Sequence, residues 1–432
     1  TDESGGYLIP EEMETDIVNG IEEENIYKRG TLMKRKYPKV IISEEGEKWL
    51  DKGQMWMYRN NAVNIDETIE NGALVDIITT TGRYLGTGFI SKNSHITVRI
   101  LSKDINEIFD RNFFKRRIQF AYDFRKTVEK ENLTNCRLVF GEADELPGLT
   151  VDRYNDILVC QISSYGLDKI KDMIYEILLE VLTEDGQDVK GIYERNDIKV
   201  RAKEGLPLEK GYWRNINLPT TTIINENGIN LSVDVENGQK TGYFLDQKAN
   251  RVLLRNIAYG KKVLDCFSHT GGFALNAAYG KAKEVVAVDV SQTALDQGYA
   301  NAKLNNLQGC ISFVKDDVFD YLDKCKKGQF DIIVLDPPAF TKSRRTVDHA
   351  YNGYKKINMK AMKLLGRGGY LITCSCSRFM ETDNFEKMLR ESAHEAGVTL
   401  KQVSVTQQNP DHPILWTMEE TSYLKFYIFQ II

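Results

Sequence analysis

The stretch Val263-Leu264-Asp265-Cys266-Phe267-Ser268-His269-Thr270-Gly271-Gly272-Phe273-Ala274 decides the fold of the C-terminal half of this chain. An apolar run ends in an acid, a turn with two glycines follows, and a second apolar run begins, which predicts a strand, a turn and a helix. Glycines in such a turn let the backbone approach a ligand at the carboxyl end of the strand. The G-x-G-x-x-G spacing of dinucleotide-binding turns is absent. The stretch therefore predicts a ligand-binding turn of another type.

Residues 219–432 repeat this alternation of strand-like and helical segments. Such alternation predicts a doubly wound, mostly parallel α/β sheet of the Rossmann-like kind. The last run follows its predecessor with no helical segment between, so we expect it to enter by a hairpin as the one antiparallel strand. The seven predicted strands are 263–265, 284–289, 311–314, 330–336, 369–373, 398–405 and 423–431.

Acidic residues stand at the ends of the first four predicted strands. A carboxylate after the second strand can accept both ribose hydroxyls of a nucleoside, and one after the third can accept the adenine amino hydrogen. Each acid alone is more typical of a helix cap or a solvated surface. Together with the spacing D-x-F-x-x-x-G-G-F, they resemble class I S-adenosylmethionine (SAM) methyltransferases. We interpret His269 as lining the pocket, and the predicted SAM-binding residues are Asp265, Phe267, Thr270, Gly271, Gly272, Asp289, Asp317, Asp336 and Pro337.

Two cysteines lie at the end of the fifth strand, in Cys374-Ser375-Cys376. C5 of a pyrimidine accepts a methyl group only after a thiolate adds to C6, and a donor must stabilise the charge that develops at the N3 edge. We expect Cys376 to be this nucleophile and Asp336 the partner at the base edge. Cys374 is expected, from strand parity, to point into the core.

Motifs spread over the chain carry a further resemblance: 53–59 (GQMWMYR), 142–154 (EADELPGLTVDRY), 238–247 (GQKTGYFLDQ), 336–338 (DPP), 375–377 (SCS), 411–413 (DHP) and 420–425 (ETSYLK). They are similar to those of the RlmI-like (YccW) family of bacterial large-subunit rRNA cytosine-C5 methyltransferases, from about residue 34 to the C-terminus. The resemblance implies SAM-dependent methylation of a cytosine in 23S rRNA, with Cys376 as nucleophile. It also implies an RNA-binding PUA domain and a central α+β domain before the methyltransferase domain.

The chain departs from related enzymes in two places. Gln54-Met55 stand where the family tends to have a proline before the tryptophan, and Pro337-Pro338 stand where other RNA cytosine-C5 methyltransferases carry a second, product-releasing cysteine. Two alternatives therefore stay open. One is a base-nitrogen methyltransferase that uses Asp-Pro-Pro-Ala-Phe, with Phe340 stacked on the base. The other is a non-catalytic RNA-binding module that holds SAM as a structural ligand.

The N-terminal half divides into three segments. Residues 1–32 form an acidic leader of unknown role, and residues 33–105 read as a small all-β barrel, SH3-like or OB-like in pattern. Residues 106–218 read as an α+β domain, with helical spacing over 103–130 and 167–182. Basic clusters at 34–36, 115–117 and 342–345 are each more often solvated than phosphate-binding. The residues proposed to contact RNA are Trp56, Arg59, Phe340, Lys342, Arg344 and Arg345.

Composition limits the class of protein. The net charge is −5 and 42% of the 432 residues are hydrophobic, as in ordinary globular proteins, and no run of 18 uncharged apolar residues occurs. The seven cysteines form no C-x-x-C pair, which argues against a structural zinc site or a disulfide framework. We expect a cytoplasmic protein with no metal and no membrane contact, which could form a homodimer.

Overall fold

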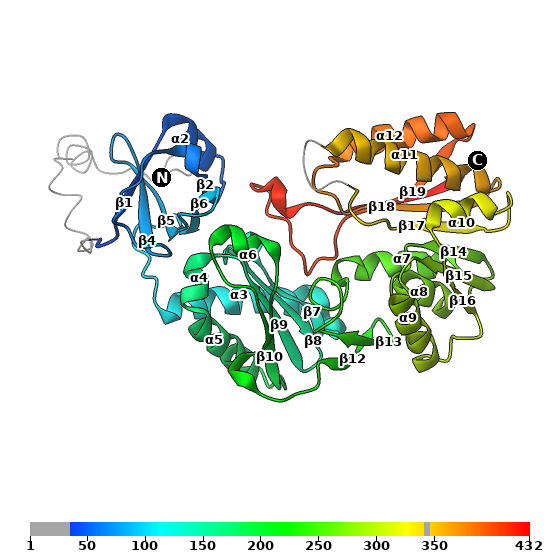
Figure 1. Cartoon of the computed structure of the whole chain (residues 1–432), viewed down its shortest axis with the longest axis horizontal. Helices are drawn as coiled ribbons and strands as arrows, with labels where there is room; N and C mark the ends of the chain where they lie inside the picture. The colour runs from blue at the N-terminus through cyan, green and yellow to red at the C-terminus, as the bar shows by residue number, and fades with distance from the viewer. Residues whose placement is uncertain (1–34, 341–345) are drawn as a thin grey trace, which may run out of the picture.

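The computed structural model describes residues 35–340 and 346–432. The acidic leader and the proposed RNA contacts Lys342, Arg344 and Arg345 lie outside the described residues. Figure 1 shows three units in chain order, with the N-terminal domain beside the central domain and the C-terminal domain at the other end.

The N-terminal domain is a six-stranded sheet in the order β2-β6-β5-β4-β1-β3. Its core joins buried apolar residues such as Val40, Met57 and Val98, and Ala62 of β3 packs against it. The sequence prediction missed one helix, α2 (Glu44–Asp51), although Ser43 caps it by accepting the Gly46 amide at 3.2 Å. The strands are β1 (Lys39–Ile42), β2 (Trp56–Tyr58), β3 (Ala62–Asn64), β4 (Leu74–Thr79), β5 (Tyr84–Ile90) and β6 (Ile96–Ser102).

The central domain is a five-stranded sheet in the order β11-β10-β9-β8-β7, and its helices α3 and α5 contact each other. The helix predicted over 103–130 is wrong at its start, because Asp110 accepts the Phe113 amide and caps α3 there. The helix predicted over 167–182 is two helices, which meet at Ile170. The elements are α3 (Arg111–Glu129), β7 (Asn135–Phe140), β8 (Leu149–Tyr154), β9 (Ile157–Ile162), α4 (Tyr165–Lys169), α5 (Lys171–Glu184), β10 (Gly191–Asn196), α6 (Lys199–Glu204) and β11 (Glu209–Tyr212).

The C-terminal domain contains a seven-stranded sheet in the order β16-β15-β14-β17-β18-β20-β19. β20 is antiparallel to both neighbours and the other pairs are parallel, which confirms the predicted α/β fold with an antiparallel last strand. A hairpin precedes it, β12 (Thr221–Glu226) and β13 (Ile229–Asp234). The sheet strands are β14 (Lys262–Cys266), β15 (Glu284–Asp289), β16 (Ile311–Lys315), β17 (Ile332–Leu335), β18 (Tyr370–Ser375), β19 (Leu400–Thr406) and β20 (Lys425–Ile431).

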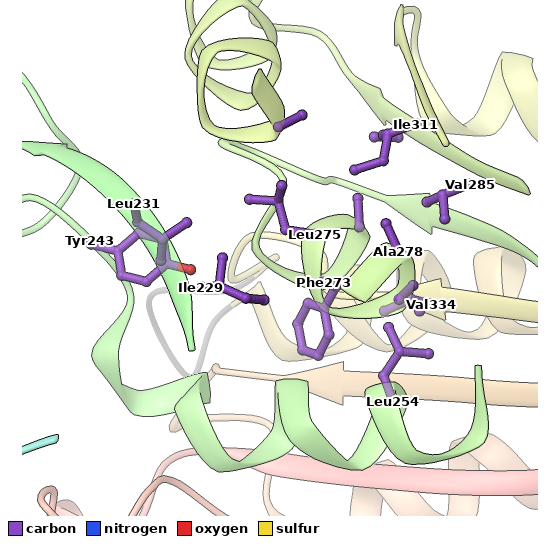
Figure 2. Close-up of a cluster of buried hydrophobic side chains, with 14 of the residues drawn as sticks. Ile229, Leu231, Tyr243, Leu254, Phe273, Leu275, Ala278, Val285, Ile311 and Val334 are labelled. Atoms are coloured by element: carbon purple, nitrogen blue, oxygen red, sulfur yellow. The ribbon is translucent and has the colours of Figure 1, made fainter. Parts of the chain in front are cut away.

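Both faces of this sheet are buried, as a parallel sheet requires. Along β15, Val285 and Ala287 join one apolar cluster and Val286 and Val288 join the cluster on the other face. Figure 2 shows the first cluster, where Ile229 of the hairpin lies close to Phe273 and Leu275. The helices are α7 (Lys248–Ile257), α8 (Gly272–Tyr279), α9 (Gln292–Leu304), α10 (Val318–Lys324), α11 (Val347–Leu364) and α12 (Thr382–Ala396).

The segment between β19 and β20 holds the three domains together. It leaves the C-terminal domain and reaches toward the other two (red in Figure 1). Arg125 Nη2 of the central domain donates to the Asp411 carbonyl at 2.8 Å, and the Arg137 amide donates to the Asp411 carboxylate at 3.0 Å. Met418 is fully buried in the core of the N-terminal domain. The segment, predicted without a helix, contains the 3-10 turn η9 (Glu419–Thr421).

Candidate functional site

A cavity of about 500 Å³ opens at the carboxyl ends of β14, β15, β17 and β18. Its size is typical of a small-molecule or cofactor site, and its position is where α/β sheets bind ligands. Several residues predicted from the sequence line it: Phe267, Thr270, Gly272, Asp289, Asp336, Pro337 and Cys376.

The turn after β14 is built for close approach of a ligand. Gly271 has φ +79° and precedes α8, and a Cβ at Gly272 would lie 2.8 Å from the Tyr243 hydroxyl. A side chain at Gly272 would therefore collide with Tyr243, which itself lines the cavity. Asp265 and Gly271 lie behind the lining. Asp265 is buried and accepts the Ala274 amide at 2.9 Å, which fixes the start of α8.

Asp289, at the end of β15, lines the same cavity. Its Oδ2 accepts the His269 amide at 2.9 Å and its Oδ1 accepts the Ser291 amide at 2.9 Å. These two bonds hold the carboxylate in place and leave lone pairs on both oxygens, since a carboxylate has about four acceptor sites. A nucleoside diol is a suitable partner for such a carboxylate. The His269 side chain also lines the cavity, and burial lowers its pKa.

Asp317 lies outside the cavity lining. It is exposed, and its Oδ1 accepts the amides of Phe319 at 2.8 Å and Asp320 at 3.3 Å, which makes it the N-cap of α10. The contact with adenine that the sequence predicted for Asp317 stays a prediction.

Asp336 and Cys376 face the cavity from the ends of β17 and β18. Burial, with the nearby Asp246 charge, raises the pKa of Asp336 to about 6, and Gln247 donates to its Oδ1 at 3.2 Å. Burial and Asp336 raise the pKa of Cys376 to about 11. The site therefore pairs a carboxyl group that keeps its proton to a higher pH than an ordinary aspartic acid with a thiol that needs help to lose its own.

Cys374 is fully buried in the apolar cluster that also contains Phe426 and Ile428. The parity argument used for it is wrong, because residues two apart in a strand lie on the same face. The two cysteines differ because β18 ends at Ser375, so that Cys376 follows the strand and turns into the cavity.

Residues 239–247 form a wall of the cavity that sequence reasoning missed as a site. Lys240 Nζ lies 2.8 Å from Asp246 Oδ2. Although burial alone would raise the pKa of Asp246, Lys240 brings it well below its ordinary value, so this buried carboxyl is charged. The central domain supports the wall, since Thr241 donates to Asp152 at 2.6 Å. The sequence feature that marks this wall is the motif 238–247, which served only for the family resemblance and to which we assigned no chemical role.

Three predicted RNA contacts lie in the described residues, and none lines the cavity. Trp56 donates its indole N–H to Glu142 at 2.9 Å, across the boundary between the N-terminal and central domains. Arg59 is exposed and donates to the Lys92 carbonyl at 3.1 Å, and the Phe340 ring packs on Tyr354 with centroids 4.7 Å apart. Their RNA roles stay predictions. The basic cluster at 115–117 is already matched by acids, among them Glu180 and Glu107.

The cavity fits SAM by its unpaired polar groups. Among the atoms that the structure describes, the buried Tyr243 hydroxyl, Ser268 hydroxyl and Asp246 Oδ1 belong to lining residues and have no hydrogen-bond partner. Buried polar atoms without partners are costly, so these groups indicate a polar ligand. The described residues hold no group of three or more His, Cys, Asp or Glu side chains suited to a metal ion. In residues 35–340 and 346–432, no helix has the length and apolarity needed to cross a membrane.

Comparison with known proteins agrees with this geometry. Residues 207–429 match the family described as S-adenosylmethionine-dependent methyltransferase, and residues 40–103 match the PUA-like domain. A structure from Streptococcus mutans assigned as a SAM-dependent methyltransferase superposes with a TM-score of 0.76 at 25% identity, covering 91% of this chain and 100% of that one. A methyltransferase complexed with SAH gives 0.78 at 24% identity with the same coverage, which shows the fold.

Two curated relatives cover nearly the whole chain. The Ribosomal RNA large subunit methyltransferase I of Aeromonas salmonicida is 41% identical over 390 residues, 89% of this chain and 97% of that protein. The protein of the same name from Klebsiella pneumoniae (strain 342) is 38% identical over 393 residues, 90% of this chain and 97% of that protein. The chain therefore belongs to the ribosomal RNA large subunit methyltransferase I family of SAM-dependent methyltransferases.

Proposed function

We propose that this protein transfers a methyl group from SAM to C5 of a cytosine in large-subunit rRNA, through a covalent adduct between Cys376 and C6. The observation that carries the proposal is that Cys376 and Asp336 share the cavity with the SAM-binding turn. The names of the relatives support large-subunit rRNA as the substrate, and the match to a PUA-like domain supports RNA binding.

The two side chains divide the chemistry. The Cys376 thiolate adds to C6, and Asp336 gives its proton to N3, so that the electron pair of the C5–C6 bond becomes available at C5. Bound SAM supplies the methyl group to this carbon. A base then removes the C5 proton, the C6–S bond breaks, and N3 returns its proton.

The base that removes the C5 proton is not a cysteine of the fourth motif, because Pro337 and Pro338 occupy that position. Water or another group at the cavity must act here.

The nitrogen alternative requires Phe340 to stack on the base. The Phe340 ring instead contacts Tyr354 and Gly353 and lies outside the cavity lining. This placement favours carbon methylation. It also leaves Asp336 available to the edge of a pyrimidine ring.

The direct test is to map 5-methylcytosine in the rRNA of cells with and without the gene. We expect one cytosine of the large subunit to lose its methyl group when the protein is absent, and to regain it when wild-type protein is supplied. A methyl group that disappears from a base nitrogen instead would replace the proposal by the nitrogen alternative.

Asp289→Ala is expected to weaken SAM binding by about 10- to 150-fold, because each hydrogen bond to a charged group contributes about 1.5–3 kcal/mol. Isothermal titration calorimetry measures the dissociation constant. Asp296→Ala is the matched control, since it removes the same charge from an exposed position on α9 outside the cavity. Equal affinities in the two variants would remove Asp289 from the SAM site.

Trp416 is expected to contact RNA. Its side chain is 95% exposed, although its turn is anchored: Gln54 donates to the Thr417 carbonyl at 2.9 Å and Met418 is fully buried. The same segment continues to Glu420, which pairs with Arg378 just beyond Cys376. An exposed indole on an anchored turn between the PUA-like domain and the cavity is suited to stack on an unpaired base.

Trp416→Ala is therefore expected to weaken RNA binding by about 5- to 150-fold, since stacking on one base contributes about 1–3 kcal/mol. Fluorescence anisotropy with an rRNA fragment measures this, and SAM affinity should not change. Tyr259→Ala is the control, because Tyr259 is an exposed aromatic residue just before β14, at the amino-terminal end of the strand and away from the cavity. Unchanged RNA affinity in Trp416→Ala would contradict the assignment.

A further inference from the structure

Lys425 is a buried lysine without an acidic partner. Its residue is only 7% exposed, yet among the residues that the structure describes no carboxylate oxygen lies within 4 Å of its Nζ. Buried lysines are normally paired, because an isolated ammonium group loses its hydration without compensation. The chain therefore keeps a costly group at this position.

Lys425 lies next to the segment that carries the proposed nucleophile, Cys376. Lys425 is the first residue of β20 and pairs with Ser375, the last residue of β18. Its Nζ donates to the Ser377 carbonyl at 2.7 Å and to the Tyr423 carbonyl at 2.9 Å. Cys376 therefore lies between Ser375, which pairs with Lys425, and Ser377, whose carbonyl accepts from the ammonium group.

The charges around Cys376 show why a cation is needed there. Asp336 and Asp246 face the thiol and oppose its ionisation, and Lys240 favours it. Lys240 is however bound to Asp246, which offsets most of its charge. The charged groups that act on Lys425 are Cys376 itself and the exposed Glu381, and burial lowers the pKa of Lys425 to about 8. Lys425 is thus still protonated at neutral pH.

We propose that Lys425 is a positioning residue for the methyl transfer: its ammonium group fixes the Cys376 segment through the Ser377 carbonyl and stabilises the Cys376 thiolate by its charge. The inference rests on the proposed role of Cys376 as nucleophile. The third N–H of the ammonium group has no partner among the described residues, and burial strengthens the attraction between its charge and the Cys376 thiolate.

The thiolate can be followed without RNA or SAM. The rate at which iodoacetamide alkylates Cys376 reports the thiolate fraction, and mass spectrometry of the Cys376 peptide separates it from the six other cysteines. We compare the wild type with Lys425→Met, Lys425→Gln and Lys425→Arg over a range of pH. The glutamine can still donate to the two carbonyls but is neutral, whereas the arginine keeps the charge. Lys401→Met, at an exposed position on β19, is the control for loss of one positive charge.

Lys425→Met and Lys425→Gln are expected to slow alkylation by about tenfold or more at neutral pH, and their difference from wild type should shrink above about pH 8, where Lys425 loses its proton. Lys425→Arg and Lys401→Met are expected to stay close to wild type. In the methylation assay, kcat should fall in the two neutral variants while SAM affinity and the KM for RNA change little.

An alkylation profile of Lys425→Gln that matches wild type would overturn the electrostatic role, whatever the effect of Lys425→Met on folding. Equal slowing in Lys425→Gln and Lys425→Arg would also overturn it, because the charge would then be irrelevant. Since alkylation involves no RNA, failure of the carbon-methylation proposal would leave these results unchanged and would appear separately, as full methyl transfer by a Cys376 variant.

Discussion

Cys376→Ser is expected to abolish methyl transfer, with a loss on the order of 10³-fold or more, while SAM binding stays close to wild type. A serine hydroxyl is a far weaker nucleophile than even a small thiolate fraction, and the cavity at the end of β18 offers no other cysteine. Methylation of the rRNA fragment by SAM labelled in its methyl group measures the loss.

The covalent adduct between Cys376 and C6 can be detected separately from methyl transfer. RNA that carries 5-fluorocytosine at the target should be trapped after methyl transfer, because fluorine cannot leave C5 as a proton does. A protein–RNA species stable to denaturation should form with wild type and disappear in Cys376→Ser.

Cys374→Ser is the matched control for the trap. Cys374 is fully buried among apolar residues and does not line the cavity, so this variant should still crosslink. A trap that depends on Cys374 would show that the nucleophile is assigned to the wrong cysteine. Persistent methylation in both variants would contradict the carbon mechanism itself.

The fold and the first part of the site followed from the sequence because their signals are local. A buried parallel strand, a glycine turn and an acid at the strand end lie within a few residues of one another, as in Val263–Ala274. The mostly parallel sheet followed from the alternation of strands and helices, and the antiparallel β20 from the lack of a helical segment before it.

The remaining parts of the site depend on contacts between distant segments. Lys240 and Asp246 reach the cavity because Thr241 bonds to Asp152 of another domain, and no periodicity reveals such a contact. Lys425 looks like an ordinary strand residue in the sequence. Only the pairing of β18 with β20 places it beside Cys376. The start of α3 at Asp110 was missed for a different reason. Apolar residues keep a helical spacing on both sides of Asp110, so the pattern did not show that this residue caps the helix.

Asp336→Asn is expected to lower kcat by about 10²- to 10⁴-fold, the usual contribution of a general acid. Asparagine keeps the shape of the side chain and can still donate a hydrogen bond, but it cannot give a proton to N3 of the base. Asp331→Asn is the matched control, because Asp331 stands at the other end of β17, where its carboxylate accepts the Lys262 amide. Calorimetry with SAM separates this effect from cofactor binding.

The pH dependence of the rate distinguishes the acid from a mere hydrogen-bond donor. The active form needs Asp336 protonated and Cys376 ionised, and their pKa values are about 6 and about 11. Below pH 6 the rate rises with the thiolate fraction. Above it, each pH unit increases the thiolate tenfold and decreases the protonated Asp336 tenfold, so the wild-type rate should level off.

In Asp336→Asn only the thiolate fraction remains, so its much lower rate should continue to rise by about tenfold per unit between about pH 5.5 and 7.5. This range lies below the pKa of about 8 of Lys425, which therefore stays protonated throughout. A variant that levels off above pH 6 like the wild type would contradict proton donation by Asp336. Its plateau would then have to arise from another group at the cavity, and the half-buried His269 is the candidate whose ordinary pKa is closest to 6.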